Sequence, residues 1–128
     1  MSNPQKFSWR QRLLSFSNAI RGIQDMLRTQ HNAWLHAGAT VFVCATGFAL
    51  GVSKLEWCVL VFSFATVWMA EALNTAVELL TDLVSPGFHP LAGRAKDVAA
   101  GAVLVAAIGS AIAGAIVLLP HACQQWNR

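Results

Sequence analysis

The segment that decides the fold is WCVLVFSFATVWMAEALNTAVELLTD, residues 57–82. Its first part, 57–70, has no charge and is mostly apolar, which is typical of a helix that crosses a membrane. Residues three or four apart share a helix face, so the second part carries a polar stripe of Glu71, Asn74 or Thr75, Glu78 and Asp82. The two glutamates are about 10 Å apart along such a helix. Carboxylates beside hydrocarbon are costly, so the stripe is expected to face a bundle interior or a functional site.

The composition of the whole chain also predicts a membrane protein. Of 128 residues, 55% are apolar and only 12% are charged, against about 25% charged in an ordinary soluble domain. The length suits a single membrane domain, 1–128. The net charge of +3 comes without a block of basic residues, so we expect no nucleic-acid partner, and the basic excess fits a membrane surface better.

Four helical segments are expected along the chain. Residues 7–28 repeat apolar side chains every three or four positions, which predicts an amphipathic helix on the membrane surface; a soluble helix packed on a core is the alternative. The segments 33–52, 55–83 and 98–119 are long and apolar enough to be transmembrane helices. We therefore predict an all-α integral membrane protein with an N-terminal surface helix and three membrane spans.

Details of these segments refine the expectation. The second span extends past the membrane into the cytoplasm, and a Pro- and Gly-containing loop, 84–90, follows it. The third span is expected to end at Pro120. Small residues recur every four positions along it, a pattern that allows close helix packing in membranes: Ala102, Ala106, Ser110 and Gly114. Near the start of the first span, His36 is either an interfacial group or part of a site.

The distribution of Lys and Arg predicts the orientation. Seven such residues lie before the first span or in the 82–97 segment: Lys6, Arg10, Arg12, Arg21, Arg28, Arg94 and Lys96. The other side holds only Lys54 and Arg128. By the positive-inside rule, the N-terminus and the 82–97 segment are cytoplasmic and the C-terminus is outside.

Ionisable side chains gather on the predicted cytoplasmic side: Glu71, Glu78, Asp82, His89, Arg94, Lys96 and Asp97. Carboxylates can hold Mg²⁺ together with substrate phosphates, a lysine can pair with a phosphate, and an interfacial carboxylate can act as a base. These are the parts that phosphoryl transfer needs, although neither GxxxxGK[ST] nor GxGxxG is present. The residues alone leave two readings open, a kinase and a structural or ion-handling bundle whose carboxylates pair with basic residues.

Two motifs resemble those of a known family. EALNTAVE at 71–78 and HPLAGRAKDVAAGAV at 89–103 are similar to the bacterial membrane-integral diacylglycerol kinase and undecaprenol kinase family, and the likeness covers nearly the whole chain. The resemblance implies a homotrimer with composite sites shared between neighbouring subunits. It also implies that MgATP phosphorylates a lipid alcohol at the bacterial inner (plasma) membrane.

The resemblance further implies roles for individual residues. Glu71 corresponds to the catalytic base and Glu78 to a metal ligand. The residues expected at the nucleotide are Asn18, Gln30, Glu78, Gly87, Phe88, His89, Lys96 and Asp97. Asn74 and Asp82 would support the site. Two alternatives stay open: Asp97 could also cap the third helix, and Lys96 with Arg94 could serve only as topology anchors.

One position departs from the family pattern. The family has a second metal-binding glutamate just before the first span, where this chain has Gln30. An amide oxygen can bind Mg²⁺ but brings no charge, so weaker metal binding, compensation by His31 or Asp25, or loss of activity are all open. We expect an active enzyme with a raised Mg²⁺ requirement.

The sequence leaves the identity of the lipid open. Diacylglycerol, giving phosphatidic acid, is the expected substrate. Undecaprenol, in cell-wall lipid recycling, is the alternative, and the details at 89–91 and 99–101 lean toward it. An inactive membrane interaction protein, motivated by Gln30, is a further alternative from a different functional class.

Overall fold

A computed structural model of the chain describes residues 8–127, and all regular secondary structure in this range is α-helical. The helices are α1 (Trp9–Thr29), α2 (His31–Leu50), α3 (Lys54–Val84) and α4 (Pro90–Trp126). Three of them, α2, α3 and α4, are long and apolar enough to cross a membrane. The predicted all-α class with three such helices is therefore confirmed. Phe7, where the first helix was expected to begin, lies outside the described residues.

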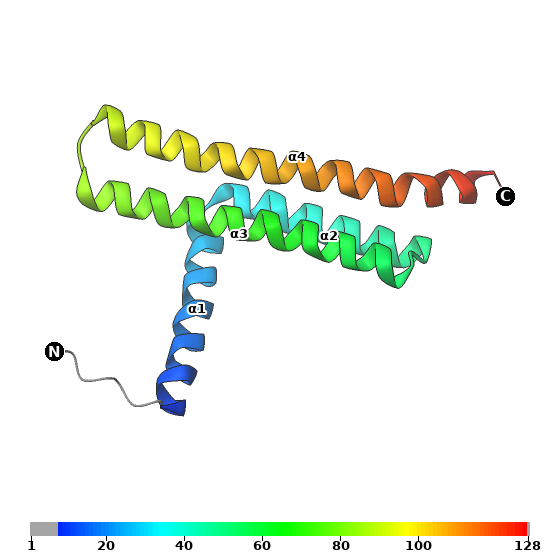
Figure 1. Cartoon of the computed structure of the whole chain (residues 1–128), viewed down its shortest axis with the longest axis horizontal. Coiled ribbons are helices and arrows are strands. Elements are labelled where there is room, and N and C mark those ends of the chain that lie inside the picture. The colour runs from blue at the N-terminus through cyan, green and yellow to red at the C-terminus, as the bar shows by residue number, and fades with distance from the viewer. Residues whose placement is uncertain (1–7, 128) are drawn as a thin grey trace.

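The three long helices run alongside one another, whereas α1 projects across their common direction (Figure 1). Only one residue, Gln30, separates α1 from α2, and its backbone is extended with φ −102° and ψ 114°. A single extended residue interrupts the helical hydrogen bonds and redirects the chain. The change in direction between α1 and α2 is therefore located at Gln30.

Local sequence explains where the other helices begin and end. Gly51 ends α2 in the left-handed conformation, φ 67°, which glycine adopts without steric cost. Ser53 and Glu56 form a capping box that starts α3. At the start of α4, the His89 side chain accepts a hydrogen bond from the Leu91 amide, and Pro90 occupies the first turn.

Helix α4 extends beyond the expected span 98–119 at both ends. The His89 cap starts it at Pro90, so the suggestion that Asp97 caps this helix is wrong, and Asp97 lies within it. The helix also continues through Pro120 to Trp126, so Pro120 does not end the helix, while the bounds 98–119 of the membrane span stay a prediction. Pro120 removes one backbone donor and crowds the carbonyl four residues earlier, and the helix nevertheless continues, with His121 of the following turn in contact with Glu56 of α3 at 2.9 Å.

The interior of the chain is small for its length. Helices α3 and α4 lie side by side and antiparallel (Figure 1). The Ser110 hydroxyl of α4 donates to the Ser63 carbonyl of α3 at 2.9 Å, and Gly114 is buried in α4. The buried apolar residues are Met26, Ala33, Val52, Leu60, Val67, Val103 and Val117. Most large apolar side chains on α2, α3 and α4 are exposed, as expected when lipid or further protein covers them.

Candidate active site

The polar stripe of α3 passes from buried to exposed along the helix. Glu71 is 1% exposed, Asn74 is 5% exposed and Glu78 is half-buried. Asp82, about one turn further, is exposed. The stripe therefore runs from the interior of the bundle to its surface, so its members differ in their access to water.

Glu71 is the most unusual residue of the stripe. Neither of its carboxylate oxygens has a hydrogen-bond partner, although both are buried. His36 of α2 lies close to it, with 3.8 Å between Nε2 and Glu71 Oε2. A buried polar group without a partner costs about 1–3 kcal/mol, so this carboxylate is kept against a stability cost, as functional groups often are.

Glu78 is held by two amide side chains. Asn74 Nδ2 donates to Glu78 Oε1 at 3.0 Å, and Gln30 Nε2 donates to Glu78 Oε2 at 3.0 Å. The residue that joins α1 to α2 is thus tied to the stripe on α3. The structure brings the three predicted residues Gln30, Asn74 and Glu78 together, whereas Asp25 and His31 are exposed and neither is hydrogen-bonded to Glu78.

The Gln30–Glu78 pair suits one magnesium ion whose remaining coordination positions are filled by phosphate oxygens. Mg²⁺ in such sites is held by one or two carboxylates together with substrate phosphates, and Glu78 offers one carboxylate. Rotation of the Gln30 amide would present its oxygen in place of its nitrogen. Asn74 Oδ1 is buried next to them without a partner. Across residues 8–127 there is no cluster of three or more His, Cys, Asp or Glu side chains suited to a metal, so substrate would have to supply the remaining ligands.

Lys96 and Asp82 form an ion pair between α4 and α3. Lys96 Nζ donates to Asp82 Oδ1 at 2.5 Å, and both side chains are at least one-third exposed. Exposed pairs of this kind stabilise a protein by at most about 1 kcal/mol. The lysine can therefore exchange this partner for a phosphate at little cost.

The loop between α3 and α4 contains three of the expected nucleotide contacts, Gly87, Phe88 and His89, and all three are exposed. Phe88 is 97% exposed. Asp97 is exposed on α4, near Lys96 in the sequence. Asn18 is exposed on α1, and the structure does not bring it into hydrogen-bond contact with these residues.

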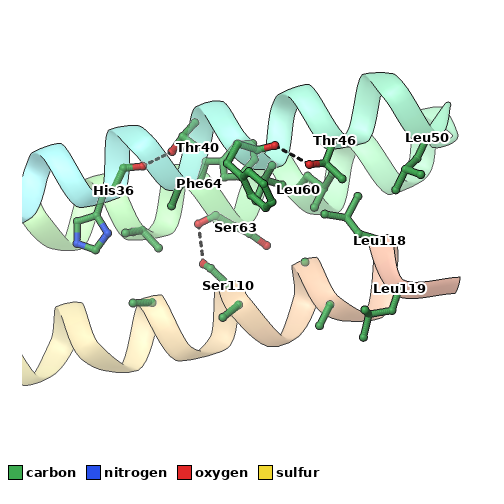
Figure 2. A pocket seen from close by; sticks show the side chains of 18 of the residues that line it. His36, Thr40, Thr46, Leu50, Leu60, Ser63, Phe64, Ser110, Leu118 and Leu119 are labelled. Carbon is green, nitrogen blue, oxygen red and sulfur yellow. Dashed lines mark hydrogen bonds between the residues drawn. The ribbon is translucent and has the colours of Figure 1, made fainter. Parts of the chain in front are cut away.

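An elongated cavity of about 470 Å³ lies between α2, α3 and α4. Figure 2 shows His36 at one end of it and Leu50, Leu118 and Leu119 at the other. Its few polar side chains include Thr40, Ser63 and Ser110. A largely apolar cavity that leads to the neighbour of Glu71 suits an amphiphilic molecule with its polar end at His36.

Two contacts of this region were not anticipated from the sequence. The His36–Glu71 proximity and the Gln30–Glu78 hydrogen bond each join residues that are at least 35 positions apart. The gap between the predicted helices 7–28 and 33–52 indicated a joint, and the family resemblance placed Gln30 at the metal site, but neither predicted the hydrogen bond between the Gln30 and Glu78 side chains. Helical spacing relates residues within one helix, and it cannot pair residues from two helices.

The structure is an all-helical bundle with three helices that could span a membrane and with Glu71 and Glu78 on the same face of one of them. Comparison with known proteins identifies the family. The family described as prokaryotic diacylglycerol kinase matches residues 17–118, most of the chain. The chain belongs to this family of lipid kinases, which confirms the expected enzyme class.

Two relatives illustrate the match. An undecaprenol kinase from Bacillus subtilis (strain 168) is 42% identical over 106 residues, which cover 83% of this chain and 86% of the relative. A diacylglycerol kinase from Synechocystis sp. is 40% identical over 109 residues, 84% of this chain and 62% of the relative.

A diacylglycerol kinase from Escherichia coli (strain K12) is 38% identical over 72 residues, which cover 56% of this chain and 59% of the relative. The chain thus spans less than two thirds of the length of these two diacylglycerol kinases. It spans most of the length of the Bacillus undecaprenol kinase.

Proposed function

We propose that this chain transfers the γ-phosphate of ATP to the hydroxyl group of a membrane lipid. One observation carries the proposal: in a member of this kinase family, a buried carboxylate without hydrogen bonds, Glu71, lies about two helical turns from an amide-held carboxylate, Glu78. The first suits proton transfer and the second suits cation binding.

In the proposed reaction, Glu71 takes the proton of the lipid hydroxyl. The lipid oxygen forms a bond to the γ-phosphorus, the bond from that phosphorus to the bridging oxygen breaks, and ADP leaves. Lys96 exchanges Asp82 for a phosphate oxygen and offsets the negative charge. When bound, Mg²⁺ supplies further charge neutralisation at the phosphates, and Glu78 with Gln30 would hold it.

The other expected residues surround the nucleotide in this proposal. Gly87, Phe88 and His89 in the loop and Asp97 on α4 would contact it, and Asn74 would keep Glu78 oriented through their hydrogen bond. Asn18 on α1 would also contact the nucleotide, either in the site of its own chain or in the site of a neighbouring copy. A homotrimer with shared sites, as the family resemblance implies, would also cover part of the exposed apolar surface.

We further propose an inner (plasma) membrane location with the active site at the cytoplasmic face. The excess of Lys and Arg near the α1 and α3–α4 segments supports this orientation, although Lys6 and Arg128 lie outside the described residues. Helix α1 would lie on the membrane surface through its exposed apolar side chains, which include Trp9, Leu13, Phe16, Ile20 and Ile23.

Two lipid alcohols are candidates. The family description and the Synechocystis relative support diacylglycerol, which would give phosphatidic acid. The Bacillus undecaprenol kinase, matched over 86% of its length, supports undecaprenol. The match to the Bacillus undecaprenol kinase covers a larger share of the relative than the match to the Synechocystis diacylglycerol kinase does. We therefore expect undecaprenol to be the better acceptor of the two lipids.

A direct assay tests the proposal. Purified protein in lipid bicelles is given MgATP labelled at the γ-phosphate, together with diacylglycerol, undecaprenol or no added lipid. We expect labelled lipid with at least one alcohol and none with Glu71→Gln. Absence of transfer to both lipids across a magnesium titration would contradict the proposal and favour an inactive membrane protein.

A further inference from the structure

His36 links the cavity to the buried carboxylate. It projects from α2, its side chain is 18% exposed, and it lines one end of the cavity (Figure 2). Its Nε2 atom lies 3.8 Å from Glu71 Oε2. Glu71 itself is almost fully buried. Of these two side chains, His36 is the one that a molecule in the cavity meets first.

The carboxylate of Glu71 lacks a donor, and its polar neighbours on α3 are already engaged. Asn74 donates to Glu78, and the Thr75 hydroxyl donates to the Glu71 backbone carbonyl at 2.9 Å. The His36 ring can still donate. A separation of 3.8 Å is longer than a hydrogen bond, but catalytic hydrogen bonds are often long before substrate binds and shorten afterwards.

The position of His36 relative to Glu71 is fixed by a second contact between the same helices. The Thr40 hydroxyl donates to the His36 carbonyl at 2.7 Å and accepts from Trp68 Nε1 of α3 at 3.2 Å. Trp68 precedes Glu71 by three residues and therefore shares its helix face. This bridge holds the α2 turn that carries His36 against the α3 turn that carries Glu71.

From this geometry we propose that His36 is a positioning residue for the reaction. Its Nε2–H donates to the Glu71 carboxylate and fixes the orientation of the base beside the end of the cavity that His36 lines. The inference rests on the proposed function of Glu71 as base. It goes beyond that function because the orientation of the base then depends on a residue from a different helix.

Two substitutions of His36 separate hydrogen bonding from packing. His36→Leu removes the donor, and His36→Gln keeps an N–H group at similar reach. We expect His36→Leu to lower kcat by about 10- to 100-fold with an unchanged KM for ATP, and His36→Gln to recover most of that loss. His121→Leu is the matched control, because it removes the histidine of the other His–Glu pair, and we expect it to leave kcat unchanged.

Several outcomes would overturn the inference. These are native kcat in His36→Leu, equal losses in His36→Leu and His36→Gln, or an additional loss when His36→Leu is combined with Glu71→Gln. Full activity of Glu71→Gln alone would instead contradict the proposed function, so the two failures are distinguishable.

A spectroscopic measurement covers the case in which His36→Leu does not fold. In protein with ¹⁵N-labelled histidine, Glu71→Gln should shift the imidazole resonances of His36 and leave those of His121 in place. Unchanged His36 resonances would overturn the inference, because a ring that donates to Glu71 must sense the loss of its charge.

Discussion

Helix α3 places two glutamates beside histidines of other helices, Glu56 near its start and Glu71 near its middle, but the two environments differ. Glu56, near the start of α3, accepts from the Ser53 amide at 2.7 Å and contacts His121 of α4 at 2.9 Å. Glu71, further along the same helix, has no hydrogen bond to its carboxylate and lies 3.8 Å from His36. Glu56 is about one-third exposed, and Glu71 is 1% exposed.

We interpret the difference as one between a structural pair and the pair that the proposed reaction uses. At Glu56, the carboxylate completes a capping box and ties α3 to the last turns of α4, so its hydrogen-bonding capacity is used within the fold. At Glu71, the carboxylate oxygens accept no hydrogen bond although they are buried, and an unsatisfied buried polar group destabilises the fold. Residues that break a local rule in this way are those expected at functional sites.

The largest effect among substitutions around Glu71 is expected for Glu78→Gln. This change keeps the shape of the side chain but removes the one carboxylate that faces Gln30 and Asn74. Because a bound cation contributes several kcal/mol to phosphoryl transfer, we expect kcat/KM for ATP to fall by about 100-fold or more. A magnesium titration of kinase activity measures this, and an unchanged magnesium dependence would exclude Glu78 as a ligand.

A smaller effect is expected for Lys96→Met. It removes the cation that the ion pair with Asp82 holds at the surface. Loss of one charged contact to phosphate should lower kcat/KM for ATP by about 10- to 100-fold. Lys54→Met, at the start of α3, is the matched control. If both variants lose activity equally, Lys96 has no special relation to the nucleotide and acts only as a surface charge.

Gln30→Glu should change the metal requirement more than the maximal rate. It places a second carboxylate opposite Glu78, so the two should repel each other without metal and attract magnesium together. We expect a lower melting temperature without Mg²⁺, its recovery with Mg²⁺, and a roughly five-fold lower half-saturating magnesium concentration for activity. Gln24→Glu, an exposed change on α1, is the control. If Gln30→Glu and the native chain have the same magnesium curve, Gln30 does not weaken metal binding.

The smallest effect on activity is expected for His121→Gln, which changes the α4 partner of Glu56. It weakens the contact with Glu56 that holds the turn after Pro120. We expect faster hydrogen exchange in residues 121–126 and native kcat, because these residues are far along α4 from the candidate site. A loss of kcat as large as that of His36→Leu would show that the two His–Glu pairs do not differ in role.

Much of this comparison was accessible from the sequence. The apolar segments predicted the three long helices, because a membrane span needs about 20 apolar residues. Helical spacing placed Glu71, Asn74 and Glu78 on one face, and the structure shows that face passing from buried to half-buried. The capping box at Ser53 and Glu56 is also readable as a local motif.

The pairings between helices were not accessible. The family resemblance placed Gln30 at the metal and nucleotide site, but its hydrogen bond to Glu78 depends on the turn between α1 and α2. His121 was not considered, because Pro120 was expected to end the third span. The helix continues through this proline, and His121 in the turn that follows contacts Glu56, which lies 65 residues earlier in the sequence. Composition and periodicity record local preferences, whereas these contacts depend on tertiary packing.

The central claim is that Glu71 performs chemistry and Glu56 maintains structure. The most direct test gives both residues the same substitution and measures kcat and the melting temperature of Glu71→Gln and Glu56→Gln. We expect Glu71→Gln to lose about 10²- to 10⁴-fold in kcat without loss of stability, and Glu56→Gln to keep native kcat with a lower melting temperature. Native kcat in Glu71→Gln, or an equal loss of kcat in both variants, would contradict the account.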